Sequence, residues 1–189
     1  LAEETFDGPV DVYAANAGIG GGADLADEAA WAASFDVNVM AHVRAARALV
    51  PHWLERGSGR YVVTASAAGL LSMVDSPVYS VTKHGAVAFA EWLALTYRHR
   101  GIVVQAICPQ GVRTAMLERS GELRDLLSHD TALSATDVAE QAWQALEGDT
   151  FLVLPHPEVA DYYTARATGT DRWLAGMNRI QQRLEQSRT

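Results

Sequence analysis

The 189-residue sequence has a single cysteine, Cys108, a single lysine, Lys83, and no long uncharged run. One cysteine cannot form an intrachain disulfide. The sequence also lacks an N-x-S/T glycosylation site and a signal-peptide pattern, and these absences together favour a reducing compartment, the cytoplasm. The longest uncharged stretch, residues 61–74, is shorter than the roughly 18 residues that a membrane span needs. The sequence therefore predicts neither a disulfide framework nor a transmembrane helix.

Positive charge is also scarce, because 15 basic residues stand against 23 acidic ones and give a net charge of -8. No cluster of basic side chains interrupts this balance, so nucleic acid and anionic membranes are poor candidates for partners. With 49% hydrophobic and 20% charged residues, the composition excludes a disordered, collagenous or disulfide-rich chain. No repeat or linker divides the sequence, which we interpret as a single domain over residues 1–189.

Apolar runs at residues 10–15, 61–65, 102–107 and 151–154 predict four short strands. Between them the apolar residues follow a helical period, over residues 31–53, from Pro77 to about residue 98, and from a Ser134 to Asp137 capping box to Gly148. The stretch 158–189 resembles a helical appendage. Because near-continuous apolar strands alternate with helices, the predicted fold class is α/β, a doubly wound parallel sheet, in which ligands bind beyond the carboxyl ends of the strands.

The only lysine lies four residues after Tyr79 in a predicted helix, so the two side chains share one face. A nearby ammonium lowers the pKa of a phenol, which makes a tyrosine a plausible general acid or base. Ser66, at the end of the preceding strand, can donate a hydrogen bond to a carbonyl oxygen held against the phenol. The alternative interpretation is a surface pair of Tyr79 and Lys83 with a serine that merely ends a strand. Chance alone makes this arrangement of the three residues rare.

These residues stand in a wider pattern. Y-S-V-T-K at 79–83 is preceded by T-A-S-A-A-G at 64–69, by V-N-V at 37–39 and by N-A-G at 16–18. In this order and at these separations the motifs resemble those of the short-chain dehydrogenase/reductase family, in its shorter single-domain branch. The resemblance covers residues 10–154. It implies a Rossmann-like oxidoreductase domain, of which this chain would form the C-terminal two thirds to three quarters.

For catalysis, the resemblance implies roles for four residues. Tyr79 would be the acid/base that exchanges a proton with the substrate oxygen, and Ser66 would orient and polarise the substrate carbonyl. Lys83 would lower the pKa of Tyr79 and hydrogen-bond the nicotinamide ribose. Asn38 matches the family asparagine that bends its helix and holds a water in a proton relay; taken alone, it could equally be a polar residue inside a helix.

The resemblance also implies a site for NAD or NADP, without deciding between the two. The turn at 16–18 matches the family's N-N-A-G segment, with Ala15 in place of the first asparagine. The segment 109–114 matches P-G-x-x-x-T, which meets the nicotinamide carboxamide, with Gln110 in place of the usual glycine. The cofactor-binding residues expected on this basis are Asn16, Ala17, Gly18, Tyr79, Lys83, Pro109, Gly111, Val112 and Thr114.

The family's glycine-rich T-G-x-x-x-G-x-G turn, which receives the pyrophosphate, has no counterpart in this sequence. Residues 18–23 fit G-x-G-x-x-A, with Asp36 at the distance of a ribose-binding acid, but Asp36 lies inside a helical pattern and not after a second strand. The sequence therefore predicts a chain that starts just before the family's fourth strand. We expect the parent protein to carry roughly 70 to 90 further N-terminal residues, because a doubly wound sheet needs them to complete its core.

The predicted function is an NAD(P)-dependent oxidoreductase that interconverts a secondary alcohol and a ketone, or reduces an aldehyde. The rivals are a catalytically silent member with a binding or regulatory role and a sugar-nucleotide epimerase or dehydratase. The two long helices are apolar over more than one face, which predicts a homodimer or homotetramer formed through them. The small-molecule alcohol or carbonyl substrate is not identified. The loop 115–133 is expected to line its pocket with Met73, Val74, Asp75 and His156, and no metal is expected.

Overall fold

The centre of the fold is a four-stranded sheet with the strand order β1-β2-β3-β6. The computed structural model describes residues 2–120 and 132–188. The strands are β1 (Val12–Ala15), β2 (Gly59–Thr64), β3 (Ile102–Ile107) and β6 (Leu152–Val153), and each neighbouring pair is parallel. The predicted parallel α/β architecture is thus confirmed.

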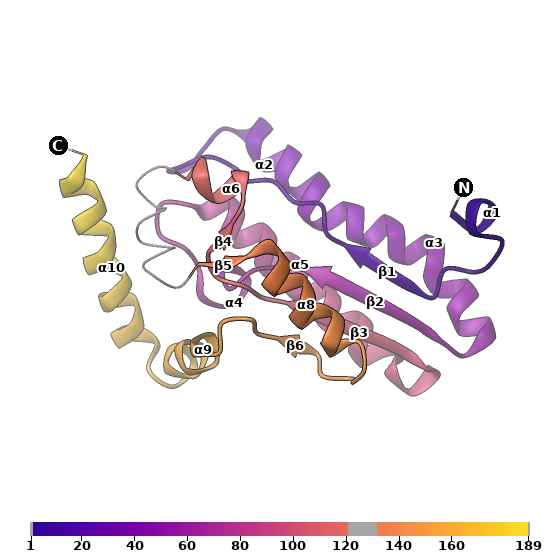
Figure 1. The fold of residues 1–189 in the computed structure, drawn as a ribbon. Helices are drawn as coiled ribbons and strands as arrows, with labels where there is room; N and C mark the ends of the chain where they lie inside the picture. Colours follow the sequence, from indigo (N-terminus) through magenta and orange to yellow (C-terminus); the bar gives the residue numbers. More distant parts are fainter. Residues whose placement is uncertain (1, 121–131, 189) are drawn as a thin grey trace.

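Long helices cover the sheet (Figure 1). The connection from β1 to β2 runs through α2 (Glu28–Phe35), a π-helical turn η1 (Asp36–Met40) and α3 (Ala41–Arg56), and β2 leads to α5 (Pro77–Tyr97). In this view α8 (Ala135–Ala145) lies in front of the sheet, whereas α3 and α5 lie behind it. Pro77 stands in the first turn of α5, and Ser134 and Asp137 form the predicted capping box of α8.

Several short elements lie outside the sequence prediction. They are α1 (Ala2–Phe6), α4 (Ala68–Leu71), the 3-10 turn η2 (Arg98–Arg100), α6 (Ala115–Glu118) and a small parallel sheet of β4 (Val112–Arg113) and β5 (Leu133–Ser134). The predicted C-terminal helical appendage consists of α9 (Glu158–Thr168) and α10 (Thr170–Ser187). In Figure 1, α4, α6, the small sheet and α10 gather on the side toward which the arrows of β1 and β2 point.

The core lies between the sheet and the helices α3 and α5. Trp53 from α3 and Tyr61 from β2 are fully buried there, with their rings 6.2 Å apart. Their polar atoms are satisfied, because the Trp53 indole donates to the Val10 carbonyl at 2.7 Å and the Tyr61 hydroxyl donates to the His42 carbonyl at 2.8 Å. Buried aromatic rings of this size contribute strongly to stability when their polar tips keep a partner.

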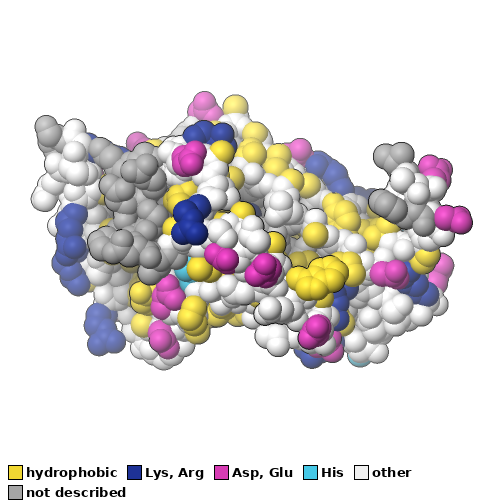
Figure 2. All heavy atoms as spheres, viewed as in Figure 1, with side chains coloured by type: hydrophobic (Ala, Val, Ile, Leu, Met, Phe, Trp, Pro, Cys, Tyr) yellow, Lys and Arg dark blue, Asp and Glu magenta, His cyan; other side chains and the backbone are white. Residues whose placement is uncertain are grey.

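The opposite face of the sheet is less well covered. Trp143 of α8 is 73% exposed and Val12 of β1 is 45% exposed. Figure 2 shows hydrophobic side chains at the surface in the region of α8. Within residues 2–120 and 132–188, no helix combines the length and the apolar character that crossing a bilayer demands.

Gly101, at the turn into β3, is a position where a side chain does not fit. Its φ is +83°, and a Cβ there would lie 1.9 Å from the Gly57 carbonyl oxygen. We expect Gly101→Ala to lower the free energy of unfolding by about 3 kcal/mol, because the left-handed backbone and the contact with main chain both penalise a side chain. Urea unfolding measures this change. Gly148→Ala is the control, since a Cβ at Gly148 meets no atom within 4 Å; equal losses in both variants would contradict the argument.

Candidate active site

The predicted catalytic residues meet beside the carboxyl ends of β1 and β2. Ser66 follows β2 by two residues, and Tyr79 and Lys83 lie one turn apart on α5. The Nζ atom of Lys83 is 5.6 Å from the centre of the Tyr79 ring. Strand ends and one helix therefore bring together three residues that the sequence places up to 17 positions apart.

Lys83 is buried, with 3% of its surface exposed. Its ammonium donates a hydrogen bond to the Thr64 carbonyl, at the end of β2, at 2.9 Å. An ammonium has three N–H donors, so this bond leaves donors for a ligand. Burial lowers the pKa of Lys83 to about 8, because a charged group loses its hydration in the interior. The amine is still mostly protonated at neutral pH.

The pKa of the Tyr79 phenol is determined mainly by burial. Burial raises the pKa of Tyr79, and a hydrogen bond from Ser66 acts in the opposite direction. The lowering by Lys83 that the sequence led us to expect is not among the causes of this shift. At neutral pH the phenol is therefore protonated, which is the form that can donate a proton. The Ser66 hydroxyl also accepts a hydrogen bond from the Ala68 backbone at 3.1 Å, which fixes its position at the start of α4.

Asn38 lies in the π-helical turn η1 and is fully buried. Its Oδ1 accepts from the Ile19 backbone N–H at 2.8 Å, and its Nδ2 donates to the Ile19 carbonyl at 2.9 Å and to Thr82 Oγ1 at 2.9 Å. Thr82 directly precedes Lys83. Asn38 thus joins the loop after β1 to the helix that carries the tyrosine and the lysine, and the π-turn breaks the regular helix at this residue.

One helical turn after Asn38, the buried side chain of His42 has a ring nitrogen, Nε2, without a hydrogen-bond partner in the described part of the chain. Burial, aided by the charge of Lys83, lowers the pKa of His42 to about 4. A histidine in the unfolded chain titrates near 6.5, so the unfolded state binds more protons between pH 6.5 and 4. The free energy of unfolding therefore falls as the pH decreases through this window.

We expect this loss to reach about 3 kcal/mol at pH 4, since each pKa unit corresponds to about 1.4 kcal/mol. Urea unfolding of the wild type and of His42→Leu at pH 7 and pH 4 measures it. The leucine variant should lose correspondingly less stability between the two pH values. A pH dependence that is the same in both proteins would show that other groups cause the acid sensitivity.

Gly18 leaves room beside the lysine. A Cβ at this position would lie 3.1 Å from Lys83 Nζ and 3.4 Å from Asn38 Oδ1. The absence of a side chain, the donors that remain on the ammonium and the polar surroundings fit the hydroxyl groups of a nicotinamide ribose. Asn16 and Ala17, from the same turn, are exposed; they lie on the same loop without a hydrogen bond to the catalytic residues.

The loop after β3 runs close to Ser66. The Pro109 carbonyl accepts from the Ala67 backbone at 2.8 Å, and the Gly111 carbonyl accepts from the Leu133 backbone at 3.2 Å. Val112 belongs to β4, and Thr114 caps α6 with its side-chain oxygen. Pro109, Gly111, Val112 and Thr114 are thus held by main-chain contacts at the carboxyl end of the sheet.

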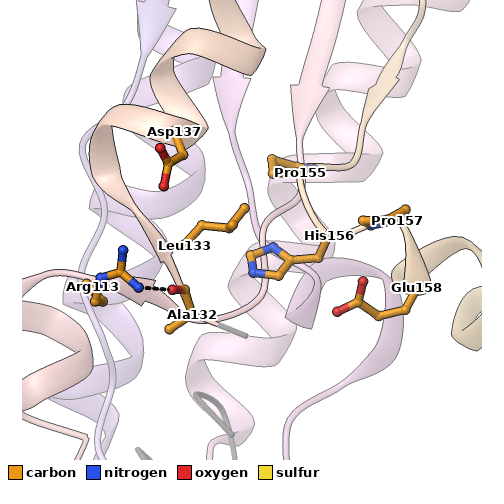
Figure 3. A pocket seen from close by; sticks show the side chains of 8 residues that line it. All are labelled: Arg113, Ala132, Leu133, Asp137, Pro155, His156, Pro157 and Glu158. Carbon is orange, nitrogen blue, oxygen red and sulfur yellow. Dashed lines mark hydrogen bonds between the residues drawn. The ribbon is translucent and has the colours of Figure 1, made fainter. Parts of the chain in front are cut away.

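A hollow of about 350 Å³ lies next to Arg113 and His156 (Figure 3). It is lined by Arg113, Ala132, Leu133, Asp137, Pro155, His156, Pro157 and Glu158. Of the residues expected to line the substrate pocket, Leu133 and His156 line this hollow, whereas Met73, Val74 and Asp75 do not. Asp75 is paired with Arg188 at 2.6 Å. Residues 121–131 of the predicted pocket loop lie outside the described residues.

Comparison with known proteins shows the family to which the chain belongs. The sequence profile described as short chain dehydrogenase matches residues 1–125. The chain belongs to the short-chain dehydrogenase family. A 1-deoxy-11-beta-hydroxypentalenate dehydrogenase of Streptomyces exfoliatus is 34% identical over 168 residues, which cover 84% of this chain and 60% of that protein. A putative ketoacyl reductase of Streptomyces coelicolor is 41% identical over 114 residues, 58% of this chain and 43% of that protein.

Among solved structures, a short-chain dehydrogenase/reductase from Burkholderia phymatum in complex with NAD superposes with a TM-score of 0.79 at 29% identity. The match covers 90% of this chain and 69% of that one. The chain spans about 60% of the length of the curated dehydrogenase that it matches. As a short-chain dehydrogenase, it carries the Tyr79, Lys83 and Ser66 set at the carboxyl edge of its sheet.

Sequence reasoning missed how the loop after β3 is held. The Gln110 side chain donates to Glu158 Oε1 at 2.8 Å, and the Gln110 backbone N–H donates to His156 Nδ1 at 3.1 Å. These partners are 46 and 48 residues away, so no local pattern connects them. The signal that was available is Gln110 itself, which stands where the family motif has a glycine.

Proposed function

We propose that this short-chain dehydrogenase is an NAD(P)-dependent oxidoreductase that interconverts a secondary alcohol and a ketone, or reduces an aldehyde. The observation that carries the proposal is the meeting of Tyr79, Ser66 and Lys83 beside the space at Gly18. A protonated phenol next to a serine hydroxyl and a buried ammonium is suited to proton exchange with a carbonyl oxygen or an alcohol.

In the reductive direction, the carbonyl oxygen of the substrate accepts hydrogen bonds from the Ser66 and Tyr79 hydroxyl groups. The dinucleotide supplies the hydride when it is bound. The Tyr79 phenol gives its proton to the oxygen as negative charge develops there, and the Lys83 ammonium stabilises the phenolate that remains. Asn38 holds the loop after β1 against α5 through its hydrogen bonds to Ile19 and Thr82, which keeps Tyr79 and Lys83 in position beside Gly18. Alcohol oxidation uses the same residues in reverse.

The cofactor would be NAD or NADP, and its nicotinamide-ribose half fits beside Lys83, Tyr79 and Gly18. Lys83 and Tyr79 would hold the ribose hydroxyl groups next to Gly18, with Asn16 and Ala17 on the same turn. Pro109, Gly111, Val112 and Thr114 would meet the nicotinamide from the loop after β3. What supports this assignment is the position of both loops at the carboxyl ends of their strands, where doubly wound sheets bind ligands.

The proposal extends to assembly and location. Apolar side chains on the long helices remain exposed, among them Met40 of η1 and Val81, Trp92 and Leu95 of α5, the last at 79% exposure. Such a patch supports a homodimer or homotetramer through these helices. A single monomeric species in analytical ultracentrifugation would contradict it. The single buried cysteine supports a cytoplasmic location.

A turnover assay tests the function. The protein, expressed from its complete coding sequence, is incubated with NADH or NADPH and a panel of ketones and aldehydes that includes a ketoacyl compound, and with NAD or NADP and the corresponding alcohols. Change in absorbance of the reduced nicotinamide is the readout. Cofactor binding without turnover of any member would favour a silent binding protein. Turnover of a sugar nucleotide without net oxidation would favour the epimerase or dehydratase.

A further inference from the structure

Helix α9 contacts both sides of the candidate active site, although it lies beyond residues 1–125, which match the family profile. At its beginning, Glu158 accepts the hydrogen bond from the Gln110 side chain. Near its end, Arg166 donates to the Leu70 carbonyl of α4 and lies 3.3 Å from His84 Nε2 of α5. The helix spans roughly 16 Å, at about 1.5 Å per residue.

The contact at the beginning of α9 is partly buried and specific. His156 is 3% exposed, and Figure 3 shows it between Pro155 and Pro157, next to the Glu158 carboxylate. The His156 Nδ1 atom accepts a hydrogen bond from the Gln110 backbone N–H. Gln110 is therefore held twice, by main chain and by side chain, and a glycine at this position would keep only the first bond.

The contact at the other end involves residues that lie close in sequence to the candidate catalytic residues. His84 directly follows Lys83, and its Nδ1 lies 2.9 Å from the Ser80 carbonyl, to which it donates, so that Nε2 is free to accept from Arg166. Leu70 follows Ser66 by four residues in α4. Val159, in the first turn of α9, is fully buried and packs in the core, which anchors the helix.

We propose that α9 is a strut that sets the position of the 109–114 loop relative to Tyr79 and Ser66. Gln110, which contacts the beginning of α9, is the positioning residue. The proposal rests on the proposed function, since that loop is assigned there to the nicotinamide. The strut transmits position because a helix that is bonded near both ends by partly buried contacts and packed in the core through Val159 has little freedom to bend or slide. Gln110 acts through the loop and does not itself touch the reacting atoms.

Gln110→Glu tests the first end. It places a second carboxylate at the 2.8 Å contact with Glu158, so the two charges repel and the loop is displaced. We expect NADH or NADPH binding, measured by fluorescence titration, to weaken at least 10-fold, and exchange of the Gln110 backbone amide to accelerate. The double variant Gln110→Glu with Glu158→Gln exchanges donor and acceptor, and should restore both readouts to within about threefold of the wild type.

Gln181→Glu is the matched control. Gln181 donates to Glu185 at 2.9 Å on the exposed surface of α10, so the same chemical change occurs away from the site and should alter neither readout. Wild-type behaviour of Gln110→Glu, or failure of the double variant to recover, would overturn the proposal. If the wild type binds neither dinucleotide, the proposed function fails, and amide exchange at Gln110 still decides whether the strut holds the loop.

Arg166→Leu tests transmission along the helix. The change removes the contacts to Leu70 and His84 at one end of α9, and a strut predicts faster amide exchange at residue 110, near the other end. Circular dichroism and urea unfolding establish that the variant is folded. In a folded variant, exchange at residue 110 equal to that of the wild type would show that Gln110 is held only locally, and the strut would be rejected.

Discussion

Tyr79→Phe is expected to lower kcat by about 10³-fold while leaving the affinity for the dinucleotide within a few-fold of the wild type. General acid-base catalysis contributes roughly 10² to 10⁴ to a rate, and the phenol is the group placed to exchange the proton with the substrate oxygen. The substitution removes one oxygen from a half-buried ring and leaves Lys83, Gly18 and the loop after β3 in place. Steady-state kinetics and fluorescence titration of the same preparation separate turnover from binding.

The direction of the pKa shift adds a pH dependence to this prediction. Burial raises the pKa of Tyr79, so the phenol stays protonated through neutral pH and carbonyl reduction should be insensitive to pH there. Alcohol oxidation needs the phenolate, so its rate should rise with pH. Tyr97→Phe is the control, because it removes the same hydroxyl from the last residue of α5. A Tyr79→Phe enzyme with wild-type kcat would remove Tyr79 from the mechanism.

Local patterns account for the parts of the fold that the sequence predicts well. The strand at 102–107 has the predicted bounds, and Pro77 and the Ser134 to Asp137 capping box mark helix starts in both sequence and structure. Each depends on the chemistry of a few neighbouring residues. The proximity of Tyr79, Lys83 and Ser66 was predictable for the same reason, since Tyr79 and Lys83 are one helical turn apart and Ser66 follows a recognisable strand.

The features of the fold and the candidate site that the sequence did not predict depend on contacts between distant residues. The pairing of β4 with β5 involves strands of two residues each, too short to show a period, and its hydrogen bonds join Gly111 to Leu133. The π-turn at Asn38 depends on its bonds to Ile19 and Thr82, 19 and 44 residues away. Burial, and not the expected influence of Lys83, dominates the pKa shift of Tyr79, and the extent of burial is not visible in sequence spacing.

Lys83→Met is expected to impair turnover severely and yet to make the protein more stable at pH 7. The ammonium is the donor proposed for the ribose and the cation proposed to stabilise the phenolate, so its loss should weaken dinucleotide binding at least 10-fold and reduce kcat/KM by about 10³ or more. Methionine matches the length of the lysine stem and is readily accommodated in a core. The function of Lys83 is thus expected to cost stability.

The sign of the stability change follows from the pKa. Folding lowers the pKa of Lys83 from 10.5 to about 8, so the unfolded chain holds a proton that the folded chain releases between these values. The wild type therefore gains stability as the pH rises from 8 to 10.5, and below pH 8 the buried charge costs about 3 kcal/mol. Removing the charge in Lys83→Met relieves this cost, but the variant also loses the hydrogen bond to the Thr64 carbonyl, which contributes about 1 kcal/mol to stability. The free energy of unfolding at pH 7 should therefore rise by about 2 kcal/mol.

Urea unfolding at pH 7 and pH 10.5 decides the matter, because the advantage of Lys83→Met should be present at the lower pH and disappear at the higher one. Arg44→Met is the control. It removes a cation paired with Asp36 at the exposed surface, where such pairs contribute little to stability, and should leave both activity and its pH profile unchanged. A methionine variant less stable than the wild type at pH 7 would mean that the buried ammonium is well satisfied, and that its low pKa is not a cost borne for catalysis.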